Sequence, residues 1–247
     1  MKHGLLLSTL VLSLSIFGCS KTSEQDVISD AQACLNKATA ATVDTCVAKV
    51  SGISGEQADA IRCYGAFIKE GITSASKLVQ ALDTISSGIN NSNYETFLGL
   101  VSFTSQGTTG TPAAVLNYDL AKVSSTLCAQ SKVKSGTLIS TFAFLANALY
   151  KTGCQAASPT CTAISCATSN ANCIPNGVIA IALAPATYST LLSDLGTVVV
   201  NTYLVACESG AKTDSMCTLI NLSVSEAGGT SNTEAVGTNF IENLTNP

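Results

Sequence analysis

The sequence predicts an all-α domain, a disulfide-stapled antiparallel bundle of several helices with no sheet. Apolar residues recur at helical intervals along most of the chain, and short polar stretches separate these segments. Runs of alternating apolar and polar residues, which indicate strands, are missing. Hydrophobic residues make up 46% of the chain and charged residues 11%, against about 25% charged in typical proteins. The chain can therefore fill a core, and its surface must consist largely of neutral polar residues.

Three helices are predicted before residue 72. Apolar side chains repeat at helical intervals in residues 28–40, and residues 43–50 form a shorter candidate. Ser54 and Gln57 have the form of a capping box, in which two side chains satisfy the first free N–H groups of a helix. Gly71 fits a helix stop, because glycine favours the position just after a helix end. The third helix is therefore expected between these signals.

The segment 74–89 has the most regular apolar spacing in the chain. Its seam consists of Leu78, Leu82, Ile85 and Ile89. This 4-3-4 spacing is typical of an amphipathic helix that packs one face against a core. Ser92 and Glu95 form a second capping box, which predicts a helix over 94–103, and residues 104–112 are a loop by composition.

Two long helices are predicted in the middle of the chain. Residues 113–130 return to helical spacing, and residues 136–150 are apolar on nearly all sides. A helix without a polar face belongs in the interior of a domain, and 136–150 is shorter than the ~20 residues that span a membrane. Residues 151–175 are polar, with four cysteines, so we expect a disulfide-stapled loop.

Further helices are predicted toward the C-terminus. Residues 177–206 are hydrophobic, and Pro185 divides them into at most two helices. The run Val198–Val200 favours a strand locally, but the surrounding pattern leads us to expect helix there. A short helix is also expected over 213–225.

The first nineteen residues have the layout of a secretory signal. After a short charged head, an apolar run extends from Gly4 to Phe17, and Gly18 then precedes Cys19. The end of this segment resembles the lipobox of bacterial lipoproteins. The resemblance implies removal of residues 1–18, with a diacylglyceryl thioether and an N-acyl chain on Cys19. The alternatives are an ordinary cleaved signal and a spanning anchor, for which this run is too short.

The same resemblance predicts the location and the domain layout. Several acyl chains hold a protein stably on a membrane, and no Asp follows Cys19 as in the inner-membrane retention signal of enteric bacteria. The outer membrane of a bacterial envelope is therefore expected, with either face open. Residues 19–27 are expected to be the lipidated cysteine and a short tether. Residues 28–225 form the helical domain, and 226–247 a polar tail with a short helix near 233–244.

Cysteine content is the second indication of export. Assigning Cys19 to lipid leaves an even set of ten, which in an exported chain is typical of disulfides. The disulfide candidates are Cys34, Cys46, Cys63, Cys128, Cys154, Cys161, Cys166, Cys173, Cys207 and Cys217. At least one of the first three must pair with a later cysteine. The last two flank a predicted turn, so we expect them to pair with each other.

The sequence predicts no metal ligand, no cofactor and no catalytic residue. The only histidine is His3, which the signal removes, so histidine-dependent mechanisms and His-ligated metal sites are excluded from the mature chain. The cysteines from Cys154 to Cys173 have the spacing C-x6-C-x4-C-x6-C, whereas zinc sites favour two to four intervening residues. Without Lys2 the chain carries 11 basic and 16 acidic residues, so nucleic acid is not an expected partner.

One arrangement keeps an enzymatic alternative open. Ser74-Ala-Ser-Lys77 and Lys151-Thr152-Gly153 resemble fragments of the penicillin-binding and β-lactamase pattern, in which a lysine accepts the proton of a serine. An S-x-N element between them is missing. The simpler interpretation is the start of one helix and the end of another.

Three function classes follow from these observations. The first is a non-enzymatic, membrane-anchored lipoprotein that serves as a binding, adhesion or envelope-assembly module with an unknown envelope partner. The second is a helical carrier of a lipid or another apolar ligand, which requires a closed apolar cavity. The third is a histidine-independent hydrolase with Ser–Lys or carboxylate chemistry. We expect the first.

Overall fold

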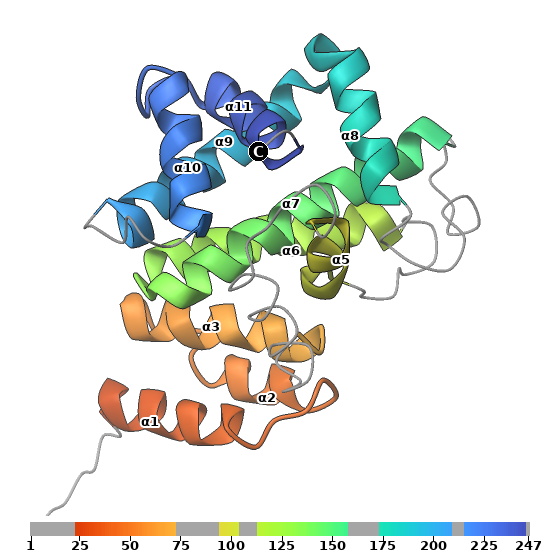
Figure 1. The fold of residues 1–247 in the computed structure, drawn as a ribbon. Coiled ribbons are helices and arrows are strands. Elements are labelled where there is room, and N and C mark those ends of the chain that lie inside the picture. Colours follow the sequence, from red (N-terminus) through yellow and green to blue (C-terminus); the bar gives the residue numbers. More distant parts are fainter. Residues whose placement is uncertain (1–22, 73–93, 104–112, 158–172, 209–214, 246–247) are drawn as a thin grey trace, which may run out of the picture.

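The computed structural model describes residues 23–72, 94–103, 113–157, 173–208 and 215–245 (Figure 1). All regular structure in these ranges is helical, which confirms the predicted class. The helices are α1 (Glu24–Leu35), α2 (Val43–Ala48), α3 (Glu56–Lys69), α5 (Tyr94–Val101), α6 (Ala113–Gln130), α7 (Lys134–Ala157), α8 (Cys173–Leu183), η2 (Pro185–Tyr188), α9 (Ser189–Thr202), η3 (Tyr203–Cys207), α10 (Ser215–Glu226) and α11 (Thr233–Thr245). The seam predicted for 74–89 lies outside the described residues.

The helices stack in layers (Figure 1). α1 and α2 form one end, α3 follows, the antiparallel pair α6 and α7 crosses the middle, and α8 to α11 cover the far side. The main core gathers on α7, where Phe142, Phe144 and Leu145 are completely buried. A smaller apolar cluster joins α1, α2 and α3. The prediction of a buried central helix is therefore confirmed, although α7 is longer than expected and includes Lys151–Ala157.

Helical structure extends beyond both ends of the predicted domain. α1 begins at Glu24 because Ser23 caps it: the Ser23 hydroxyl accepts from the N–H of Asp26, and the Asp26 carboxylate accepts from Ser23. Residues 24–27 are therefore helix and not tether. At the other end, the short helix expected near 233–244 is present as α11. It packs on α9 and buries Val236 and Phe240, so this part of the chain belongs to the core.

The predicted signals around α3 have mixed outcomes. No capping box forms at Ser54; Gly55 precedes the helix with a φ of 117° and no side chain caps it. The predicted stop at Gly71 is confirmed. Its φ is 68°, and the N–H groups of Gly71 and Ile72 bond to the carbonyls of Ile68 and Phe67, which is a Schellman motif.

The Val198–Val200 run lies in α9, as expected, and η3 extends this helix as a π-helix. By length and composition, Pro185–Cys207 is the stretch among the described residues that could cross a membrane. Half of its most apolar window is buried inside the protein, where it packs against α11 and α7. This packing accounts for its apolar character.

Three disulfides link neighbouring helices. Cys34–Cys46 joins α1 to α2, Cys63–Cys128 joins α3 to α6, and Cys207–Cys217 joins η3 to α10. The predicted disulfide formation is confirmed for these six residues, including the long-range bridge. Cys154 is also disulfide-bonded. Cys19, Cys161 and Cys166 lie outside the described residues, and Cys173 begins α8.

Candidate functional site

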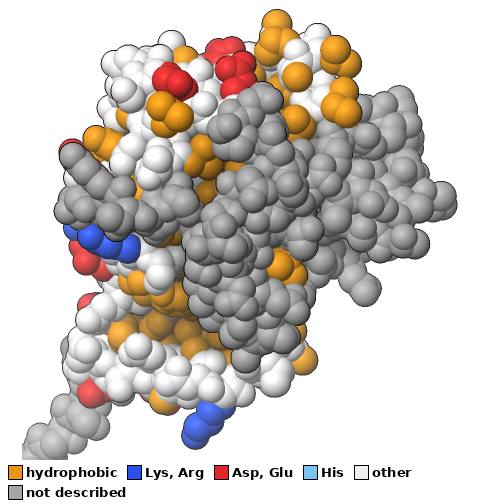
Figure 2. Space-filling view, in the orientation of Figure 1, with side chains coloured by type: hydrophobic (Ala, Val, Ile, Leu, Met, Phe, Trp, Pro, Cys, Tyr) orange, Lys and Arg blue, Asp and Glu red, His pale blue; other side chains and the backbone are white. Residues whose placement is uncertain are grey.

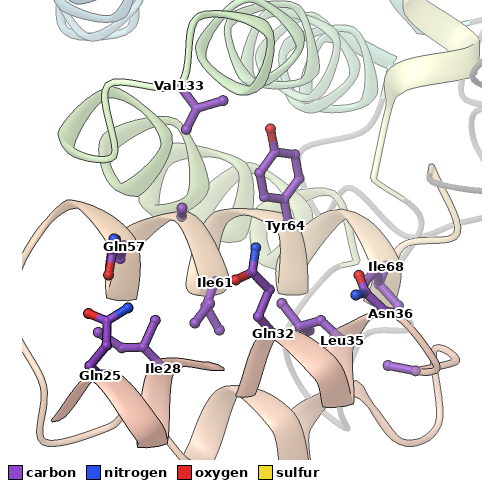
Figure 3. A pocket seen from close by; sticks show the side chains of 12 residues that line it. Gln25, Ile28, Gln32, Leu35, Asn36, Gln57, Ile61, Tyr64, Ile68 and Val133 are labelled. Atoms are coloured by element: carbon purple, nitrogen blue, oxygen red, sulfur yellow. The ribbon is translucent and has the colours of Figure 1, made fainter. Parts of the chain in front are cut away.

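A groove of about 630 Å³ lies between α1 and α3, and the turn between α6 and α7 borders it (Figure 3). We call it the α1–α3 groove. It is open to solvent, and hydrophobic side chains are visible in the hollow between these helices (Figure 2). None of its twelve lining residues is charged. The groove is therefore a neutral surface in a protein with a net charge of −4.

Four carboxamides, which we call the amide rim, border the groove. They are Gln25, Gln32 and Asn36 from the α1 side and Gln57 from α3. The three α1 positions are seven and four residues apart, and these separations place side chains on one helix face. In Figure 3, Gln25 and Gln57 lie at one end, Asn36 lies at the other, and Gln32 reaches from α1 toward α3.

The floor of the groove is aliphatic. Leu35 and Ile61 are buried, and Ile28 and Ile68 are partly buried against them. These four residues belong to the small cluster that joins α1, α2 and α3. The same side chains therefore hold α1 near α3 and present the apolar surface of the groove.

The polar groups of the groove are available to a ligand. The four amide-rim side chains are exposed and form no hydrogen bond with the described residues. The Tyr64 hydroxyl lies in the groove below Val133 and is likewise without a partner there (Figure 3). Each carboxamide offers both donors and an acceptor, and the phenol offers one of each. The groove thus combines five free neutral polar groups with an apolar floor.

Covalent and ionic links fix the walls of the groove. The Cys34–Cys46 bridge and the ion pair of Asp30 with Lys49 hold α1 on α2. Arg62 donates to the carbonyls of Val50 and Ile53, at 2.5 and 2.6 Å, and so fixes the connection from α2 to α3. The groove is therefore formed before any ligand binds.

The turn that borders the groove is held as well. Lys132, next to Val133, pairs with Glu56 at the start of α3, with 2.5 Å between Nζ and Oε1. Lys132 has a φ of 56°, a left-handed backbone conformation that is uncommon outside glycine. The Cys63–Cys128 bridge adds a covalent link between α3 and α6 nearby. Val133 is thus fixed in place over Tyr64.

Charged side chains gather at a second place, between α6, α7 and α9. The Tyr118 hydroxyl donates to Asp194 at 2.8 Å, Lys122 pairs with the same carboxylate at 2.6 Å, and Lys151 lies 3.9 Å from the centre of the Tyr118 ring. Burial raises the pKa of Tyr118, and the hydrogen bond to Asp194 acts in the same direction. Burial lowers the pKa of Lys151. These contacts bind the three helices together and leave Tyr118 protonated at neutral pH.

The residues of the Ser–Lys alternative are not brought together among the described residues. Ser74 and Lys77 lie outside them, and Lys151 sits in the cluster around Tyr118. The sequence contains another Ser-x-x-Lys, from Ser131 to Lys134, and it forms a helix connection in which the Ser131 hydroxyl donates to the Cys128 carbonyl. Within the described part of the chain, no cluster of three His, Cys, Asp or Glu side chains could hold a metal ion.

Another groove, of about 480 Å³, lies between α8 and α11. Its polar groups already have partners: Thr238 donates to the Glu234 carbonyl, and Asn243 donates to Glu226. The α1–α3 groove differs because its polar groups are free. We therefore take the α1–α3 groove as the candidate site.

The sequence pattern alone did not identify this site. Helical spacing predicts a helix over 28–40, but Gln25 falls in the predicted tether, so the sequence analysis misses the amide face of α1. The spacing of Gln25, Gln32 and Asn36 around the apolar residues of that helix was the available signal. Comparison of the chain with protein-family models, curated proteins and solved structures gives no match. The groove is therefore interpreted from its own chemistry.

Proposed function

We propose that the protein is a lipid-anchored, extracytoplasmic binding module of a bacterial outer membrane, without catalytic activity, and that it binds its partner in the α1–α3 groove. The observation that carries the proposal is the set of five free neutral polar groups above an aliphatic floor. Pockets that bind ligands typically combine such an apolar lining with a few well-placed polar groups. Disulfides beside the groove suit an oxidising compartment.

The short chain segment between Cys19 and α1 would determine how far the groove lies from the membrane. If Cys19 carries the acyl chains, four residue steps separate it from Ser23, where the cap of α1 begins. Four extended residues reach at most ~14 Å, half of what a tether to residue 27 would allow. The groove would therefore operate close to the membrane surface, where α1 begins.

Two alternatives receive less support. A carrier needs an enclosed cavity, whereas the middle of the described core is filled by Phe142, Phe144 and Leu149, and the α1–α3 groove is open. A hydrolase needs a nucleophile beside a base. The partly buried amine of Lys151, which was the candidate for a base, lies against the Tyr118 ring.

The anchor is tested by the intact mass of the native protein, purified from its bacterium with and without reduction. We expect loss of residues 1–18, three acyl chains on Cys19 and oxidation of the ten remaining cysteines. An unlipidated mass would overturn the localisation.

The binding role is tested in cells with a photo-crosslinking amino acid placed at position 32 of the full-length protein. Gln130, an exposed glutamine at the end of α6 outside the groove, is the matched control position. We expect a discrete adduct from position 32 and none from position 130. Equal labelling from both positions, or no adduct from either, would contradict a binding role for the groove.

A further inference from the structure

We infer that the groove binds an extended, uncharged peptide segment with apolar side chains at alternate positions. This inference rests on the proposed function, because it names the partner of the same groove. It follows from four properties: which polar groups are free, how they are spaced, what charge surrounds them, and what covers the floor.

The free groups match a peptide backbone in the extended state. A backbone presents alternating N–H donors and C=O acceptors, and both lose stability when they are buried without partners. Gln25, Gln32, Asn36 and Gln57 each supply donor and acceptor atoms from one side chain. A helix satisfies its backbone internally and would leave the amide rim unused. The rim therefore favours an extended segment over a helical one.

The spacing fits a short segment. Gln25 and Asn36 are eleven residues apart along α1, which at 1.5 Å per residue is about 16.5 Å. An extended chain rises about 3.3 Å per residue, so about five residues span the rim. In that conformation alternate side chains point to the same side. Those on one side would contact the aliphatic floor, and the others would face solvent.

The electrostatics exclude charged ligands from the floor. No lining residue carries a charge, so a carboxylate, phosphate or ammonium group on the aliphatic floor would lose water without gaining an ion-pair partner. The aliphatic residues Ile28, Leu35, Ile61 and Ile68 outnumber the one aromatic side chain of the groove, Tyr64. This lining fits branched apolar side chains better than the flat faces of sugar rings. The occupant is therefore a peptide with aliphatic side chains.

The test uses the mature lipoprotein reconstituted in phosphatidylcholine vesicles and a fluorescent, end-capped peptide, acetyl-Asn-Leu-Asn-Val-Gln-Leu-Asn-amide. Fluorescence anisotropy measures its dissociation constant. We expect saturable binding that weakens when the same residues are reordered so that the apolar ones are adjacent. We also expect weaker binding when the apolar positions, which face the floor, are replaced by Glu.

Matched variants test whether the peptide binds in the α1–α3 groove. Ala60→Lys places a charge in the groove, whereas Ala66→Lys places the same charge on α3 at a residue of similar exposure outside the groove. We expect Ala60→Lys to weaken binding at least ~10-fold and Ala66→Lys to leave it unchanged. Gln32→Leu removes one carboxamide and should weaken binding about 3- to 10-fold. Gln130→Leu is its exposed control.

The outcomes separate this inference from the proposed function. Peptide binding that the groove variants abolish supports the inference. Absence of peptide binding, or binding that Ala60→Lys and Ala66→Lys reduce equally, overturns it. If a neutral N-acetylglucosamine oligomer binds in a groove-dependent manner and the peptide does not, the groove is still a binding site but its occupant is a glycan. A native protein without acyl chains would refute the proposed lipid anchor and would leave the peptide-binding inference unaffected.

Discussion

The crossing of α9 and α11 provides a direct test of the packing. Gly196 of α9 and Gly237 of α11 meet where the two backbones touch. A Cβ built on Gly196 would lie 1.6 Å from the carbonyl oxygen of Thr233, and one on Gly237 would lie 2.0 Å from that of Leu192. Both obstructing atoms are backbone, so no side-chain rotation can make room. Either substitution by alanine must push the helices apart.

The magnitude follows from the required displacement. Restoring a normal contact distance needs a shift of about 1.5–2 Å, which also loosens the buried side chains Val236, Phe240 and Leu244 on α11. Overpacking costs about 1–3 kcal/mol and sometimes more, and we take about 4 kcal/mol because rigid backbone must move. Alanine regains about 1 kcal/mol through helix propensity. The net loss is about 3 kcal/mol, or roughly 6–12 °C in melting temperature for a domain of this size.

The assay is urea unfolding of the oxidised protein, followed by circular dichroism at 222 nm. Gly136→Ala in the first turn of α7 is the control, because its Cβ would make only ordinary contacts, the closest at 3.4 Å to the Cys63 sulfur. We expect that control to match the wild type or exceed it slightly. The Gly196→Ala and Gly237→Ala double variant should lose less than the sum of the single losses, since both act on one contact. Single variants as stable as the control would refute the close approach.

Three further predictions use the same unfolding assay. Replacing Cys63 and Cys128 together by serine should lower the free energy of unfolding by about 4 kcal/mol, because their bridge spans 65 residues. Gly71→Ala should cost about 1–2 kcal/mol, since its φ of 68° is unfavourable for a residue with a Cβ. The free energy of unfolding should fall as pH rises above about 10, because tyrosine ionises there in the unfolded chain while the raised pKa of Tyr118 keeps the folded phenol protonated. Tyr118→Phe leaves Asp194 paired with Lys122. This variant should show a flatter pH dependence of stability between pH 8 and 11.5.

Helices that bury a continuous apolar face could be predicted from the sequence. α6 has the predicted bounds, 113–130, and the buried segment 136–150 lies within α7. Periodicity works there because burial alone determines which residues must be apolar. The first and last residues of the helices were harder to predict. α1 begins at a capping box that uses Asp26 instead of the usual Glu or Gln. The helix of α11 was predicted near 233–244, but the polar residues around it gave no sign that it packs into the core.

The candidate site could not be predicted for a different reason. A groove exists where two helices lie side by side without closing, and this depends on their separation and not on either helix alone. The amides of Gln32 and Gln57 come from different helices. Only the fold places them on one rim. Similarly, the sequence singled out Lys151 for its Lys-Thr-Gly motif, and the fold assigns that side chain to a contact with Tyr118.

The many Ser and Thr residues of this chain explain how its helices pack closely with few charged side chains. Buried Ser and Thr side chains on α6, α7 and α10 donate to backbone carbonyls three or four residues earlier in their own helix, as Ser124, Ser140, Thr141 and Ser223 do. Such local bonds satisfy a buried hydroxyl without a partner from another helix. A polar sequence with few charges can therefore pack its helices closely. Buried Asn147 makes the same kind of bond, to the Ala143 carbonyl. The exposed carboxamides of the rim make no such bond, so their donors and acceptors remain available for a partner.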